Sequence, residues 1–145
     1  MLHFTIQSAG LGEAEAICKI SKKVLNTELS RDEIKRLFEE IFEDVEQIIM
    51  TAINSAHTVG FVHARRVKDF VRGSYTEIVS IGIYPYYQKQ GAGTSLLLGV
   101  EQWSRQMLTP ELKCIPPRDN EGMRRLLTGC GYVENGQGIF EKSIV

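Results

Sequence analysis

The chain has 145 residues, a length typical of one domain with a substantial buried core, so we expect a single domain over residues 1–145. Its 17 basic and 18 acidic residues give a net charge of −1, which argues against a nucleic-acid partner. No apolar run is long enough to cross a membrane, and the N-terminus lacks a signal-peptide pattern. Three scattered cysteines without a Cys-x-x-Cys pair favour reduced thiols and a cytoplasmic protein.

The first half of the chain predicts two helices placed among strands. Ser30 and Glu33 form the capping box that typically starts a helix, and an apolar stripe follows it. Apolar periodicity predicts, in chain order, a strand over 2–7, a helix from Ala14 to Leu25, a helix from the Ser30 cap to Phe42, and strands over 45–53 and 57–66.

The second half predicts an alternation of strands and helices. Residues 78–83 are apolar on both faces, which is typical of a central strand. The predicted elements are a strand over 74–84, a helix over 93–107, a strand from Glu111 to Ile115, a helix from Asn120 to Thr128, and strands over 132–135 and 138–143. The order β-α-α-β-β-β-α-β-α-β-β indicates an α+β fold with a mixed, mainly antiparallel sheet flanked by helices.

A glycine loop, Gln88 to Thr94, connects the central strand to the following helix. Such a loop brings backbone N–H groups and the positive end of a helix dipole to one point, an arrangement that binds anions. The dinucleotide fingerprint is excluded because Leu96 stands where a third glycine is needed. The Walker pattern is excluded because no Gly-Lys-Ser/Thr triplet closes the loop. A tight turn without a ligand is the alternative.

Two motifs carry a resemblance to a known family. The loop reads Gln88-x-x-Gly91-x-Gly93, and the later segment reads Asn120-x-x-Met123-x-x-Leu126-Leu127-x-x-x-Gly131-Tyr132. Both motifs, in this order and on these elements, resemble the GNAT N-acetyltransferase superfamily, and the predicted element order resembles that family from end to end. The resemblance implies the GNAT fold and acetyl-CoA as co-substrate.

The resemblance also implies which residues bind acetyl-CoA. Backbone N–H groups of the loop would hold the pyrophosphate, and Lys89 would add charge unless it is an ordinary surface lysine. Backbone groups of Ile81 and Ile83 would pair with the pantetheine arm as an extra strand does. The implied cofactor-binding residues are Ile81, Ile83, Gln88, Lys89, Gln90, Gly91, Ala92, Gly93, Thr94 and Asn120.

Two catalytic candidates lie on or beside the central strand. Glu77 matches the position of a glutamate base in one branch of the family, and strict alternation places it on the face of Ile81 and Ile83 unless a bulge intervenes. The alternative is an ion pair with Arg65 or Arg72. Tyr84 is the candidate acid or acceptor-site residue, with aromatic packing as its alternative. Many members have a Tyr acid where this chain has Leu127, so the acid is unassigned.

The implied activity is acetyl transfer from acetyl-CoA to a primary amine of a small molecule or a protein. The alternative is a non-catalytic module that senses acyl-CoA. The acidic stretch 39–46 either attracts a cationic amine or is a solvated helix face. His63 is a candidate proton relay or an ordinary strand histidine, and we expect no metal. Homodimers are common in the family, and the C-terminal strands offer a place to pair.

Overall fold

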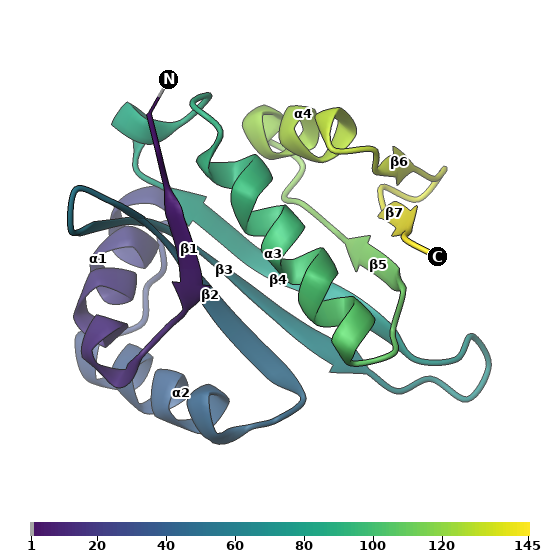
Figure 1. Cartoon of the computed structure of the whole chain (residues 1–145), viewed down its shortest axis with the longest axis horizontal. Coiled ribbons are helices and arrows are strands. Elements are labelled where there is room, and N and C mark those ends of the chain that lie inside the picture. The colour runs from purple at the N-terminus through teal and green to yellow at the C-terminus, as the bar shows by residue number, and fades with distance from the viewer. Residues whose placement is uncertain (1) are drawn as a thin grey trace.

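A computed structural model describes residues 2–145, and its seven strands form one sheet in the order β1-β2-β3-β4-β5-β7-β6 (Figure 1). The strands are β1 (Thr5–Ser8), β2 (Gln47–Asn54), β3 (His57–Val67), β4 (Tyr75–Ile83), β5 (Glu111–Cys114), β6 (Val133–Glu134) and β7 (Phe140–Ser143). The helices are α1 (Ala14–Val24), α2 (Arg31–Glu43), α3 (Ala92–Gln106) and α4 (Glu121–Gly129), with short 3-10 turns η1 (Leu11–Glu13) and η2 (Pro85–Tyr87). The predicted α+β fold and element order are confirmed.

Hydrogen bonding confirms one detail of the prediction and corrects another. The capping box of α2 is present, because Ser30 Oγ accepts from the N–H of Glu33 and Glu33 Oε1 accepts from the N–H of Ser30, both at 3.1 Å. The first strand begins at Thr5 and not at residue 2, because its pairing with β2 runs only from Thr5 opposite Ile53 to Ser8 opposite Met50.

Strand β4 lies in the middle of the sheet, as predicted. It pairs antiparallel with β3 along most of its length and parallel with β5 over only three residues. The parallel pairing ends where Ile78 lies opposite Cys114. Within residues 2–145, the remaining part of β4, from Val79 to Ile83, therefore has no strand partner on its β5 side.

The helices cover the two faces of the sheet separately. On one face α3 buries Leu96, Leu97 and Val100 completely, in a core that includes the apolar side chains of β3 and β4. On the other face α1 and α2 pack Ile20 and Phe38 around a smaller cluster. Figure 1 shows α3 crossing the sheet, with α4 beside its first turns and α1 and α2 grouped at the β1–β2 side.

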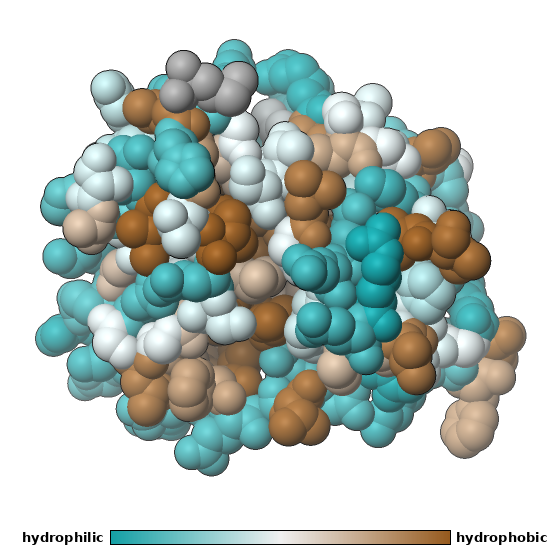
Figure 2. All heavy atoms as spheres, viewed as in Figure 1, coloured by the Kyte–Doolittle hydropathy of each residue, from teal (hydrophilic) through white to brown (hydrophobic). Residues whose placement is uncertain are grey.

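Hydrophobic and hydrophilic side chains are mixed over the face seen in Figure 2, and the apolar ones form separate groups. One such group projects at the tip of the β3–β4 hairpin, where Phe70 and Val71 are exposed. None of the helices within residues 2–145 combines the length and the apolar composition that crossing a bilayer requires.

Candidate functional site

A β-bulge in β4 decides which of its side chains face which helices. Ala64 lies opposite Ile78 and His63 lies opposite Ser80, so Val79 is an extra residue without a partner on β3. Its side chain is 43% exposed. Because Val79 is an extra residue, the side chains that follow it point to the faces opposite to those expected if the whole strand alternated regularly.

The bulge corrects the face predicted for Glu77. Strict alternation placed Glu77 on the same face as Ile81 and Ile83, which pack in the core under α3. With the extra residue counted, Glu77 lies on the opposite face, the one that also carries His63 and Ser80. The central strand thus presents apolar side chains to α3 and polar ones to the α1–α2 side.

A cleft of about 610 Å³ lies where the end of β4, the first turn of α3 and α4 meet. Eight of the ten residues predicted to bind the cofactor line it, namely Ile81, Ile83, Gln88, Lys89, Gly91, Gly93, Thr94 and Asn120. The side chain of Gln90 instead donates to the backbone oxygen of Tyr86 at 2.7 Å, and Ala92 is buried. We call this space the loop cleft.

The glycine loop presents free backbone donors to the loop cleft. Gly91 adopts a left-handed conformation with φ of 97° and caps α3 without a side chain that could accept from its first turn. The first intrahelical bond joins the N–H of Ser95 to the oxygen of Gly91 at 3.0 Å. The N–H groups of residues 92–94 therefore remain available, together with the positive end of the helix dipole, for an anion.

Close packing fixes the geometry of this loop. A Cβ atom on Gly93 would lie 2.7 Å from Leu126 Cδ2 and 3.2 Å from Ile83 Cδ1, so any larger residue would force the Leu126 side chain to move where β4, α3 and α4 converge. The side-chain amide of Gln88 donates to the backbone oxygen of Ile83 at 2.9 Å. This bond ties the loop to the last residue of β4.

Sequence reasoning missed Arg125, an exposed cation on α4 that lines the loop cleft. Together with Lys89 it brings positive charge to a space that already presents N–H groups. A signal existed, because Arg125 follows Asn120 by little more than one turn on the helix that the second motif had singled out. Asn120 itself caps that helix, since its Oδ1 accepts from the N–H of Met123 at 3.0 Å.

Glu77 has the ion-pair partner that was its alternative assignment. Its Oε1 lies 2.7 Å from Nε of Arg65, directly across from it on β3. The Glu77 side chain is 27% exposed, so the carboxylate is reachable from solvent. It does not line the loop cleft, and it reaches the α1–α2 side of the sheet beside the pair His63 and Ser80.

The structure does not bring Tyr84 to the loop cleft. Tyr84 is half-buried against the apolar cluster under α1 and α2, which is the aromatic packing that was its alternative. Leu127 is completely buried in the core. Tyr132 donates to Glu101 at 3.2 Å, and burial followed by the charge of Glu101 raises the pKa of Tyr132. None of these three side chains lines the loop cleft.

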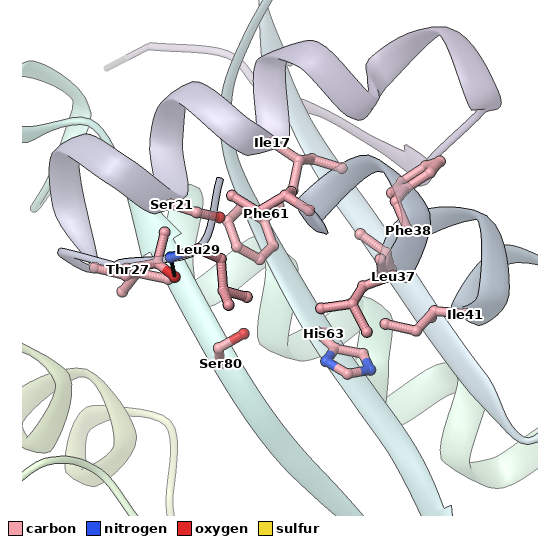
Figure 3. A pocket seen from close by; sticks show the side chains of 13 residues that line it. Ile17, Ser21, Thr27, Leu29, Leu37, Phe38, Ile41, Phe61, His63 and Ser80 are labelled. Atoms are coloured by element: carbon pink, nitrogen blue, oxygen red, sulfur yellow. Dashed lines mark hydrogen bonds between the residues drawn. The ribbon is translucent and has the colours of Figure 1, made fainter. Parts of the chain in front are cut away.

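A second cavity, of about 210 Å³, lies between the sheet and the α1–α2 layer (Figure 3). Apolar side chains of both helices, including Ile17 and Leu37, line this space, which is open to solvent, and His63 and Ser80 lie below them on neighbouring strands. Leu25 lines both this cavity and the loop cleft, so the two spaces adjoin at that side chain. We call it the α1–α2 cavity.

His63 is the titratable group of the α1–α2 cavity. Its Nε2 lies 2.7 Å from Oε1 of Gln47. Burial, and after it the nearby charge of Arg65, lowers the pKa of His63 to about 4. The imidazole is therefore neutral at neutral pH and offers one lone pair in addition to one N–H.

The acidic side chains of the stretch 39–46 do not line either space. Glu39, Glu40 and Glu43 are exposed on α2, and none of them lines the loop cleft or the α1–α2 cavity. Asp44 accepts from Gln47, and Glu46 pairs with Arg66 and Lys68. The solvated-face interpretation of this stretch fits these positions.

Comparisons with known proteins agree with this geometry. The sequence model described as the Acetyltransferase (GNAT) family matches residues 14–132. No curated protein sequence gives a match.

Several solved structures that resemble this one in fold are described as acetyltransferases. An aminoglycoside N-acetyltransferase AAC(6')-Iy in complex with CoA superposes with a TM-score of 0.85 at 18% identity, over 93% of this chain and 91% of that one. An acetyltransferase of the GNAT family from Streptococcus pneumoniae gives 0.79 at 18% identity, over 99% and 100%. PaiA N-acetyltransferase from Thermoplasma acidophilum in complex with coenzyme A gives 0.73 at 15% identity, over 98% and 99%.

Proposed function

Because the chain belongs to the GNAT family of acetyltransferases, we propose that it transfers an acetyl group from acetyl-CoA to a primary amine, with acetyl-CoA bound in the loop cleft. The observation that carries this assignment is the convergence of the predicted cofactor residues on one space of about 610 Å³. Residues from three separate elements meet there. A tight turn alone needs no such space.

Each part of acetyl-CoA has a matching surface. The pyrophosphate fits the free N–H groups that follow Gly91, with Lys89 and Arg125 supplying positive charge. The pantetheine arm fits the open edge of β4 from Val79 to Ile83, where the backbone lacks a strand neighbour within residues 2–145. The thioester then lies near the bulge, between the loop cleft and the α1–α2 side.

The reaction needs a neutral amine and a leaving thiolate. The amine nitrogen attacks the thioester carbon, the new C–N bond forms, and the C–S bond breaks with its electron pair on sulfur. One proton leaves the nitrogen and one proton reaches the sulfur, which yields an amide and free CoA. A thiol is a far stronger acid than an alcohol, so the thiolate can depart and then take its proton from water.

We assign Glu77 as the base, directly or through one water molecule. It is a reachable carboxylate on the α1–α2 side of β4, two residues before the bulge. Replacing a general base lowers the rate by about 10² to 10⁴. Glu77→Gln should lose activity by that factor while its affinity for acetyl-CoA stays unchanged, since Glu77 does not line the loop cleft.

The test combines calorimetry with acetyl-CoA and a thiol-release assay over a panel of amines. Arg65→Gln is the matched control, because it breaks the same ion pair and leaves the carboxylate in place. Activity of Glu77→Gln should recover at high pH, where the amine loses its proton without help. Tight acetyl-CoA binding without thiol release for any amine would refute catalysis and leave the acyl-CoA-sensing alternative.

A further inference from the structure

The shape and lining of the α1–α2 cavity bear on the acceptor, an argument that rests on the proposed function. The cavity adjoins the loop cleft at Leu25, and Ser80 on its floor is the chain neighbour of Ile81 in the cleft. Ser80 and Ile81 point to opposite faces of β4, so a molecule in the cavity would approach the expected place of the acetyl group on the side where Leu25 lines both spaces.

A chain of hydrogen bonds fixes the tautomer of His63. Asp44 Oδ2 accepts from Gln47 Nε2 at 2.9 Å, and this bond helps to lower the pKa of Asp44, so the carboxylate is ionised and only accepts. The amide oxygen of Gln47 must then face His63, and Nε2 of His63 must donate to it at 2.7 Å. The remaining nitrogen, Nδ1, carries the lone pair.

Two polar groups on the floor of the cavity are left for a ligand. Nδ1 of His63 accepts no hydrogen bond from any of residues 2–145, and the hydroxyl of Ser80 has no partner in the same part of the chain. The two residues face each other on β3 and β4 (Figure 3). The His63 nitrogen can accept a hydrogen bond, and the Ser80 hydroxyl can donate or accept one. This pair suits a neutral amino group, which itself both donates and accepts hydrogen bonds.

The rest of the lining excludes highly charged acceptors. Among residues 2–145, no carboxylate lines the α1–α2 cavity, whose walls are mostly apolar side chains such as Phe38, Ile41 and Phe61. A polycation placed there would lose its water without gaining an opposite charge. An aminoglycoside is a polycationic amine and needs acidic side chains around it. The lining of the cavity is therefore unsuited to an aminoglycoside acceptor.

We propose that the acceptor is a primary amine with one compact apolar substituent, which fills the α1–α2 cavity while its amino group meets His63 and Ser80. The cavity volume of about 210 Å³, against about 610 Å³ for the loop cleft, limits the substituent to a small aliphatic or single-ring group. The neutral imidazole favours the uncharged form of the amine, the form that attacks acetyl-CoA.

The test compares amines of both kinds with the full chain. Isopentylamine and phenethylamine should give a kcat/KM at least about tenfold above that of ethylamine, because each apolar group that fills a pocket contributes a factor of about ten or more. Kanamycin and spermidine should be the poorest acceptors. A preference for these polycations over phenethylamine would overturn the proposal.

Introducing a negative charge into the cavity sharpens the test. Leu37 points into the cavity from α2 and is 44% exposed, so Leu37→Glu can fold with its carboxylate at the rim (Figure 3). It should lower kcat/KM for phenethylamine about tenfold or more without changing acetyl-CoA affinity. Leu98→Glu, a change at a 57% exposed leucine on α3, is the matched control and should leave kcat/KM unchanged.

An NMR experiment separates this inference from the proposed function. With CoA present, phenethylamine should shift the ring resonances of His63 in the wild type and shift them far less in Leu37→Glu. Turnover of amines without any shift at His63 would overturn the inference and keep the acetyltransferase assignment. A shift at His63 without turnover of any amine would support binding of the amine in the cavity but overturn the proposed acetyltransferase function.

Discussion

Protonation of His63 should destabilise the fold in mild acid. The pKa of His63 falls from an ordinary 6.5 to about 4 in the folded chain because partial burial desolvates its ring and Arg65 lies nearby. The unfolded chain therefore binds one more proton than the folded chain between these two values. Stability from the neutral ring is complete above pH 6.5, falls as the pH drops through that value, and levels off below about pH 4.

The size of the effect follows from the two pKa values. For a single group titrating at 6.5 unfolded and about 4 folded, the loss at pH 5 relative to pH 8 is at most about 2 kcal/mol. The His63 ring is only partly buried, so solvent screening reduces this to about 1 kcal/mol. A loss of this size is measurable against the stability of a small domain.

Urea unfolding at pH 5, 6, 7 and 8 measures the effect in the wild type and in His63→Gln. The free energy of unfolding of His63→Gln should fall less between pH 8 and pH 5, although its value at pH 8 is lower because the bond to Gln47 changes. The control is His57→Gln at an exposed histidine of the same strand, which should follow the wild-type profile. The reasoning fails if the His63 ring titrates near 6.5 by NMR, or if His63→Gln keeps the full wild-type slope.

Two further substitutions test the packing that supports the site. Gly93→Ala places a methyl group 2.7 Å from Leu126 and should weaken acetyl-CoA binding about tenfold in calorimetry. The control is Gly129→Ala, where a Cβ meets no atom within 4 Å and the affinity should stay unchanged. Equal affinities of the two variants would contradict the role of Gly93. Lys142→Met removes the cation that lies 3.0 Å from the carboxylate of Glu101, a residue only 3% exposed. The substitution should lower the free energy of unfolding by about 3–5 kcal/mol in urea titration, because it leaves a buried charge without a partner. A loss below about 1 kcal/mol would show that Glu101 needs no cation.

Local periodicity was enough to predict most of the fold. The helices and strands depend on repeats of 3.6 or 2 residues, which an apolar stripe such as that of α2 displays without any tertiary contact. The glycine loop was predictable for a similar reason, because Gly91 needs a positive φ and Gly93 needs close packing. The first strand was extended too far because sheet pairing, and not the apolar pattern, decides where a short strand begins.

The parts of the site that the sequence did not predict depend on long-range contacts. The bulge at Val79 lies in a run that is apolar on both faces, so no interruption of alternation marks it. Tyr84 packs against the α1–α2 cluster, a contact that depends on helices far away in the sequence. The α1–α2 cavity joins Ile17 of the first helix to Ser80 of the central strand, and only packing of the whole layer creates it. Pairing of the C-terminal strands in a homodimer stays a prediction.

The extra residue of β4 has a consequence for how tolerant this strand is to change in length. Removing Val79 would make Ile78 and Ser80 neighbours that pair with the adjacent residues Ala64 and His63. Regular alternation would then keep Glu77 and Ser80 on one face and Ile78 and Ile81 on the other. Substitution at Val79 changes only one exposed side chain. Both the residue type at position 79 and the presence of an extra residue there can therefore vary without exchanging the polar and apolar faces of β4, whereas the insertion or loss of a paired residue would exchange them.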